Sequence, residues 1–167
     1  GNSFKDSDSI TTWENLWKSS DRNTNYSLKK FNIITIMFAI HYLFKSQTTF
    51  DNLIKNIDDN LNNGGYFIGT CLDGKKLLEL FYKKNVKKNK YISGVKDGKI
   101  IWKIRRSFNI DSLEDNENCL GNPINVYISS INQEITEYLV NFDYLIEKLK
   151  EKNINLLIPE EFSLSSN

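Results

Sequence analysis

Hydrophobic residues along this chain gather in short runs, and the spacing within each run predicts the element that it forms. Residues 31–37 are almost continuously apolar and rich in β-branched side chains, which predicts a strand covered on both faces of its sheet. An aromatic loop, residues 38–44, follows. Apolar residues at helical spacing across 46–61 predict a helix, and a glycine turn at 64–65 then leads into a second buried strand at 66–70. The pattern outlines one α/β crossover, in which ligands sit where the strands end.

The second half of the chain alternates less regularly, although turn and capping residues mark several elements. A polar stretch at 109–123 is expected to be mobile. The other elements predicted are a helix capped by Asp73 and running through Phe81, a hairpin turning at Asp97 and Gly98, a strand over 125–131, an amphipathic helix over 142–150, and a last short strand over 155–158.

A chain of 167 residues with 40% hydrophobic content can bury one core. We therefore expect a single domain, or a piece of one, over 1–167. In the polar N-terminal segment, Trp13, Leu16 and Trp17 fit one face of a short helix, and a loop anchored by the two tryptophans fits equally well. The expected divisions are the polar segment 1–30, a βαβα core over 31–82, a basic loop and β-rich insertion over 83–131, a helix and strand over 132–158, and a tail over 159–167.

The charge balance limits the classes of partner. Twenty-two basic and 21 acidic side chains give a net charge of +1, so affinity for nucleic acid has to come from a local patch, which disfavours a general RNA coat. The two cysteines have neither disulfide nor zinc spacing, which favours a reducing, intracellular compartment and predicts no metal site. No apolar run is long enough to span a bilayer and no leader precedes the first strand, so we expect no membrane partner.

The one concentrated basic patch lies in residues 83–90. A solvated loop is the ordinary interpretation of such a run. The alternative is an edge that contacts the phosphates of an RNA 5′ end, and it gains support because Arg105 and Arg106 follow on the next strand. The candidate phosphate contacts are Lys87, Lys88, Lys90 and Arg105.

The only histidine, His41, lies among aromatic residues after the first strand. Taken alone it is more often a hydrogen-bonded structural residue, and its spacing suggests neither a catalytic triad nor a metal site. Its neighbours Phe38, Tyr42 and Phe44 nevertheless offer ring faces that suit stacking on a planar base. Glu137 is expected just before a helix, where it either favours the positive end of the helix dipole or accepts hydrogen bonds from a guanine edge.

Three motifs occur in order along the chain: Phe-Asn-Ile-Ile followed by Phe-Ala-Ile-His-Tyr-Leu-Phe, then Gly-Gly-Tyr-Phe-Ile-Gly-Thr followed by Asp-Gly, then Glu-Tyr-Leu-Val. Together they resemble the messenger-RNA cap guanine-N7 methyltransferases, especially those of large DNA viruses. The resemblance covers about residues 31 to 158. It implies an α/β fold, namely the C-terminal part of a Rossmann-like class I S-adenosylmethionine-dependent methyltransferase with an inserted β-hairpin and strand region on the cap side.

The same resemblance implies methyl transfer from S-adenosylmethionine to N7 of the guanine at a capped mRNA 5′ end. It places Phe38, His41, Tyr42 and Glu137 around the cap guanine, and Met37 and Phe38 against the methyl donor. Guanine N7 already carries a free lone pair, so no side chain is assigned as a catalytic acid or base. Catalysis then rests on alignment and electrostatics.

The chain departs from the family pattern at two positions, because Met37 stands where the family usually has glutamine and Leu72 where it usually has proline. No glycine-rich strand and turn precedes Phe31. We therefore expect a fragment that is inactive alone and works with the remaining capping-enzyme domains or a stimulatory subunit. The alternative is a non-catalytic, methyltransferase-like accessory subunit. The resemblance places the protein in the cytoplasm of an infected host cell or in the virion if it is viral, and in the nucleus if it is cellular.

Overall fold

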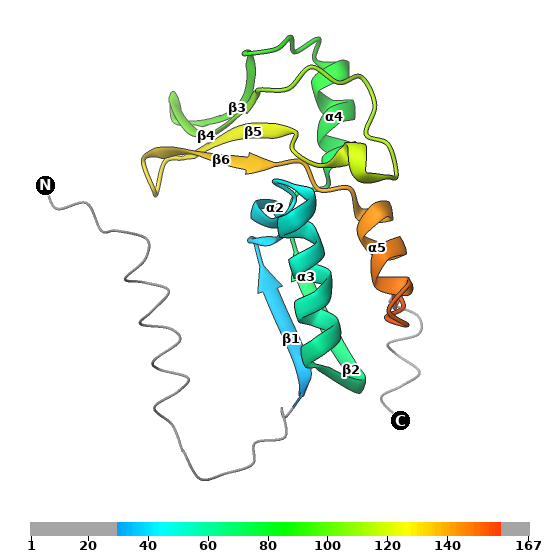
Figure 1. The fold of residues 1–167 in the computed structure, drawn as a ribbon. Helices are drawn as coiled ribbons and strands as arrows, with labels where there is room; N and C mark the ends of the chain where they lie inside the picture. The colour runs from blue at the N-terminus through cyan, green and yellow to red at the C-terminus, as the bar shows by residue number, and fades with distance from the viewer. Residues whose placement is uncertain (1–29, 158–167) are drawn as a thin grey trace, which may run out of the picture.

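The computed structural model describes residues 30–157, and the first unit of the fold is a parallel pair of strands, β1 (Phe31–Met37) and β2 (Leu61–Thr70) (Figure 1). The short helix α2 (Ile40–Leu43) and the longer α3 (Gln47–Asn60) connect the strands. A capping box at Ser46 begins α3. The predicted crossover is therefore confirmed, with β1 at the predicted residues.

The predicted glycine turn before β2 is wrong. Helix α3 passes directly into β2 at Leu61, whose backbone is already extended. Gly64, with φ of +75°, lies inside the strand, where the pairing with β1 shifts between Phe31 and Ile33. The positive φ explains the glycine, and it produces an irregularity within the strand.

The second unit is an antiparallel sheet in the order β3-β4-β5-β6, which lies across the end of β1 (Figure 1). The predicted hairpin is confirmed, with Asp97 and Gly98 both at positive φ. The predicted helices after Asp73 and over 142–150 are also confirmed. The elements are α4 (Gly74–Lys83), β3 (Tyr91–Lys96), β4 (Lys99–Arg106), the 3-10 helix η1 (Glu117–Cys119), β5 (Pro123–Ile128), β6 (Gln133–Tyr138) and α5 (Phe142–Lys150).

Strand β6 was not predicted, and the strand expected over 125–131 ends at Ile128. Glu137 consequently belongs to a strand and not to the start of a helix, since α5 begins only at Phe142. The interpretation of Glu137 as a partner of a helix dipole is therefore wrong. Most residues of β6 are polar and none is fully buried, so its strand periodicity is weak.

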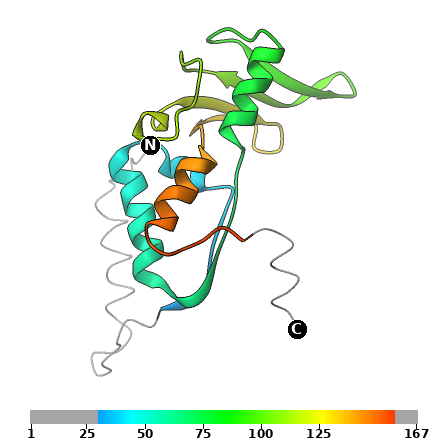
Figure 2. The ribbon, with the colours of Figure 1, turned by 90° about the vertical axis from the view of Figure 1, so that its right-hand side faces the viewer.

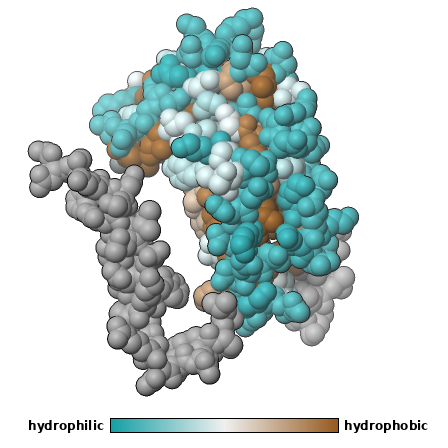
Figure 3. Space-filling view, in the orientation of Figure 1, coloured by the Kyte–Doolittle hydropathy of each residue, from teal (hydrophilic) through white to brown (hydrophobic). Residues whose placement is uncertain are grey.

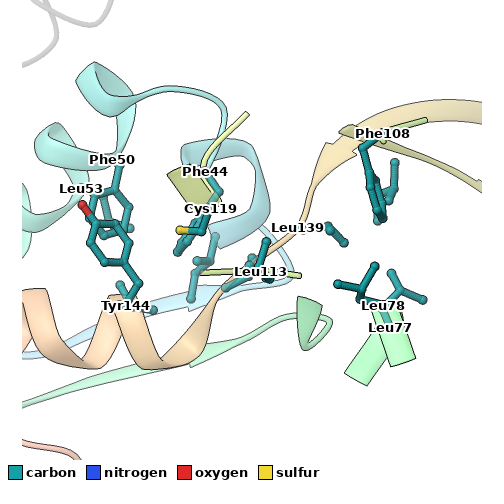
Figure 4. Close-up of a cluster of buried hydrophobic side chains, with 14 of the residues drawn as sticks. Phe44, Phe50, Leu53, Leu77, Leu78, Phe108, Leu113, Cys119, Leu139 and Tyr144 are labelled. Carbon is teal, nitrogen blue, oxygen red and sulfur yellow. The ribbon is translucent and has the colours of Figure 1, made fainter. Parts of the chain in front are cut away.

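The core joins the two units through α3, α5 and the connection before β5. Figures 1 and 2 show α5 beside α3, and the ring of Phe50 contacts those of Phe44 and Tyr144 at centroid distances of 5.0 and 4.9 Å (Figure 4). The stretch 109–123, expected to be mobile, instead contributes the buried side chains of Leu113 and Cys119 to this core. Because the stretch is otherwise polar, its sequence does not indicate that Leu113 and Cys119 are buried.

Strand β1 is not covered on both faces, which corrects the prediction. One face packs on the core through Ile34 and Ile36, whereas Ile33 and Met37 on the other face are 57% and 50% exposed. The described part of the last predicted strand, residues 155–157, forms no strand. The predicted N-terminal helix around Trp13 lies outside the described residues. Among helices in the described range, none has the length and apolar character needed to cross a membrane.

Candidate functional site

The candidate site begins where β1 ends, because the carboxyl ends of parallel strands share one edge of a sheet. Met37 and Thr70 are paired at this edge, and the Thr70 hydroxyl donates to the Met37 sulfur at 3.5 Å. The next residue, Phe38, has φ of +51° and donates its backbone N–H to the Thr70 carbonyl at 2.8 Å. A bulky residue in this region of φ is strained, and such strain is concentrated at functional sites. The strained turn holds the Phe38 ring in solvent, 71% exposed.

The expected aromatic loop contains the four-residue helix α2. Ile40 anchors it on β2, since a side chain at Gly69 would come within 2.6 Å of the Ile40 side chain. The helix buries His41 and leaves Tyr42 43% exposed, with the two rings in an edge contact at 4.2 Å. Phe44 offers no stacking surface, because it is fully buried in the core. Of the three aromatic residues proposed for stacking, Phe38 and Tyr42 have accessible rings.

Helix α2 lies beneath β6, and this contact brings together His41 and Glu137 (Figure 1). His41 Nε2 lies 3.6 Å from Glu137 Oε1, and the two side chains are only 8% and 14% exposed. This distance is too long for a hydrogen bond, and Nε2 is buried without a hydrogen-bond partner. An unsatisfied polar atom of this kind is costly unless a ligand supplies the missing bond.

Burial acts on both groups in the direction that disfavours charge. It lowers the pKa of His41 from its ordinary value and raises the pKa of Glu137 from its ordinary value. Burial therefore disfavours a charged ion pair between His41 and Glu137. The His41 ring nitrogen lies beside a Glu137 carboxyl oxygen, and the His41 ring contacts the exposed Tyr42 ring, which is an arrangement that can bind the polar edge of a planar base.

The basic candidates lie apart from this pair. Arg105 is bound locally, because its Nε is 3.0 Å from a Glu134 oxygen and its Nη1 donates to the Asn89 carbonyl at 3.2 Å. Arg106, not Arg105, occupies the same transverse row of the sheet as Glu137, so Arg105 points to the opposite face. The lysine candidates are exposed in the preceding loop: Lys87, Lys88 and Lys90. Their role stays a prediction.

Thr70, which pairs with Met37, is not among the residues expected from the sequence, although both stand at the ends of successive parallel strands. The described residues contain no cluster of metal-ligating side chains. Two hollows occur elsewhere, one of about 320 Å³ between β1 and α3 and one of about 770 Å³ between α3 and α5, and neither is lined by His41 or Glu137.

Comparisons of this chain with known proteins agree on one family. Residues 9–165 match the model of the mRNA (guanine-N(7))-methyltransferase domain. A probable mRNA-capping enzyme of Acanthamoeba polyphaga mimivirus is 29% identical over 126 residues, which cover 74% of this chain and 10% of that protein. An mRNA-capping enzyme of African swine fever virus (isolate Pig/Kenya/KEN-50/1950) is 30% identical over 132 residues, covering 78% of this chain and 15% of that protein.

A fungal protein agrees with the viral ones. The mRNA cap guanine-N(7) methyltransferase of Candida albicans is 25% identical over 134 residues, covering 79% of this chain and 28% of that protein. The matched part thus spans between 10% and 28% of the length of these three relatives. Because the family match extends over nearly the whole chain, the chain belongs to the mRNA (guanine-N(7))-methyltransferase domain family.

Proposed function

We propose that this chain forms the guanine-binding side of an mRNA cap guanine-N7 methyltransferase and corresponds to the C-terminal part of a class I methyltransferase fold. The observation that carries the proposal is the His41–Glu137 pair, buried at 3.6 Å with a ring nitrogen that has no partner. A viral probable mRNA-capping enzyme and a fungal cap guanine-N(7) methyltransferase, both similar in sequence to this chain, support the proposal. The substrate proposed is the capped 5′ end of mRNA.

The proposed roles follow from the hydrogen-bonding groups of guanine. Its N1–H and amino group donate, and the ionised Glu137 carboxylate accepts from both. The exposed Tyr42 and Phe38 rings stack on the base, and His41 fixes the position of the Tyr42 ring through their edge contact. N7 reacts through its own lone pair, so these residues orient the base and transfer no proton.

S-adenosylmethionine supplies the methyl group when it is bound. The described residues that fit it are Met37 and Phe38, which are exposed at the carboxyl end of β1 beside Thr70. In the sequence, no glycine-rich strand and turn that would cradle the rest of the ligand precedes Phe31. We therefore expect methyl transfer only when further domains of the capping enzyme or a stimulatory subunit are present.

The exposed lysines Lys87, Lys88 and Lys90 are proposed to contact RNA phosphates. Arg105 shares this proposed role, but a phosphate has to compete with Glu134 for its guanidinium group. Free cysteines, Cys71 and Cys119, agree with a reducing compartment.

A second candidate function is that of a non-catalytic accessory subunit. Two apolar side chains favour it, since Met37 and Leu72 are 50% and 42% exposed at positions where the resemblance leads us to expect glutamine and proline. Methyl transfer to unmethylated capped RNA, measured for this chain alone and for a version extended upstream, separates the two. Activity of the extended form alone supports the enzyme, whereas stimulation of a separate active partner supports the accessory subunit.

The proposed guanine contact is tested with Glu137→Gln, because the amide keeps the shape but loses the charge and one acceptor. Glu147→Gln is the matched control, since it makes the same chemical change at an exposed position of α5, outside the proposed site. Hydrogen bonds to a charged group contribute about 1.5–3 kcal/mol, so affinity for a cap dinucleotide should fall about 10- to 100-fold in Glu137→Gln. Equal affinities of the two variants would refute the proposal.

A further inference from the structure

The sheet face that carries Glu137 continues away from the His41 pair toward the hairpin ends. Side chains on one face recur at every second residue, so Gln133 and Glu137 of β6 share a face. Gln133 pairs with Ile128, which pairs with Trp102, which pairs with Gly94. These pairs form one transverse row of the sheet, parallel to the row that contains Glu137. Trp102 therefore lies on the same face as the candidate guanine contact.

The indole of Trp102 covers Gly94, because a Cβ built at that glycine would overlap the Nε1 and Cε2 atoms of the ring. A ring that covers a glycine in an edge strand stabilises the strand pair, so the contact of Trp102 with Gly94 has a structural role. The same arrangement leaves the side chain 37% exposed. A rigid indole supported on one face and accessible to solvent is a suitable platform for an unpaired base.

The surroundings of Trp102 suit an RNA strand. Lys96 follows Gly94 by two residues along β3 and so lies on the same face, and Lys99 pairs with Lys96 across the hairpin. Both lysines thus lie on the hairpin-turn side of the indole, where they can neutralise phosphates. Beside them, Figure 3 shows hydrophobic surface next to the β5–β6 turn, where Ile128 is 42% exposed.

We propose that this face is a track for the transcript and that Trp102 stacks on a base downstream of the cap, with Lys96 and Lys99 on the adjoining phosphates. This inference rests on the proposed function, because Glu137 provides the guanine end of the track. Four residues along β6 and two strand spacings separate Glu137 from Trp102, which amounts to about 16 Å. The cap's triphosphate bridge and its two riboses extend the substrate in this direction, so an early transcribed base can reach the indole.

The test uses Trp102 as a fluorescent reporter. The chain has three tryptophans, so replacing Trp13 and Trp17 with phenylalanine leaves Trp102 alone. The ligands are an unmethylated cap dinucleotide and a short single-stranded RNA with the same cap. We expect the capped RNA to quench Trp102 emission and the dinucleotide to leave it nearly unchanged, because only the longer ligand reaches the ring.

Affinity measurements on the otherwise unchanged chain complete the test. Trp102→Ala should weaken binding of the capped RNA by about tenfold without changing dinucleotide affinity, and Trp102→Phe should restore most of it. Tyr91→Ala is the matched control, since Tyr91 is an exposed aromatic residue on the opposite face of the same hairpin. Thermal unfolding of each variant shows that the fold is retained.

Three results would overturn the inference while leaving the proposed function intact. The first is tight dinucleotide binding that depends on Glu137 together with unchanged Trp102 emission when capped RNA binds. The second is a loss of RNA affinity in Tyr91→Ala instead of Trp102→Ala, which would move the track to the other face. The third is shielding of Trp102 from a soluble quencher in the chain extended upstream, which would make this face a contact within the protein. Failure of both ligands to bind would overturn the proposed function itself.

Discussion

The Asn141 side chain both caps α5 and holds the loop at Glu114 and Asp115. Replacing it, and comparing the result with the loss of a cap alone, should show how much each role contributes to the free energy of unfolding. Asn141 is completely buried, and its oxygen accepts from the backbone N–H groups of Asp143 and Tyr144 at 3.0 and 3.2 Å. Its amide donates to the Glu114 carbonyl at 2.7 Å and to an Asp115 oxygen at 2.8 Å. Asn141→Ala removes all of these bonds at once.

The magnitude follows from these two roles. Losing an N-cap costs about 1 kcal/mol, and each of the two donated bonds contributes about 1 kcal/mol, so the free energy of unfolding should fall by about 3 kcal/mol. At about 3 °C per kcal/mol for a domain of this size, the Tm should fall by about 9 °C. Circular dichroism during heating, with the same scan rate for each variant, measures this change.

Asp73→Ala provides the control, because Asp73 caps α4 by accepting from the Lys76 N–H at 3.1 Å and anchors no loop. Its Tm should fall by about 3 °C. Asn141→Asp keeps the cap and loses the donated bonds while adding a carboxylate beside Asp115, so it should be destabilised more than Asp73→Ala at neutral pH. If Asn141→Ala is no less stable than Asp73→Ala, the loop attachment contributes nothing and the reasoning is refuted.

Three further outcomes are expected. Cap-dinucleotide affinity should decrease as pH is lowered through the raised pKa of Glu137, because only the ionised carboxylate accepts both guanine donors, and titrating Glu137→Gln should give no such decrease over the same range. Gly74→Ala should lower the free energy of unfolding by about 2 kcal/mol, measured in urea, because its Cβ would lie 2.5 Å from the Val140 carbonyl oxygen; an unchanged midpoint would contradict this packing. Burial raises the pKa of Cys119 to about 12 and leaves the residue fully inaccessible, so a thiol reagent at pH 8 should modify it only after unfolding, and modification of the native protein would disprove its place in the core.

The sequence predicts those elements whose local and long-range preferences agree. Residues 31–37 are apolar throughout and form β1, and α4 has both a capping aspartate and helical periodicity. Strand β6 has neither signal, because its polar residues are placed by pairing with β5 and not by burial. The same holds for the stretch 109–123, where Leu113 and Cys119 are isolated apolar residues in a polar sequence. Such elements depend on contacts that no local pattern contains.

In the candidate site, too, some features follow from the sequence and others depend on long-range contacts. His41 and Glu137 come from positions far apart in the chain, and only the motif resemblance suggested that they meet, whereas the structure adds their 3.6 Å separation. The positive φ of Phe38 leaves no trace in the sequence, because no glycine or asparagine marks it. Phe44 is aromatic like its exposed neighbours Phe38 and Tyr42, so the sequence does not distinguish it from them. Its burial is seen only in the structure, where its ring contacts Phe50.

The uncovered face of β1 and β2 affects how substitutions in this chain should be judged. Ile33, Met37 and Ile68 are between 44% and 57% exposed, although parallel strands are normally covered on both sides. A mutational scan that ranks positions by accessibility would class them as tolerant. We expect the opposite ranking in a cell, where polar substitutions at Ile33 and Ile68 would be depleted as strongly as those at core positions, so accessibility in this chain understates the constraint on its first two strands.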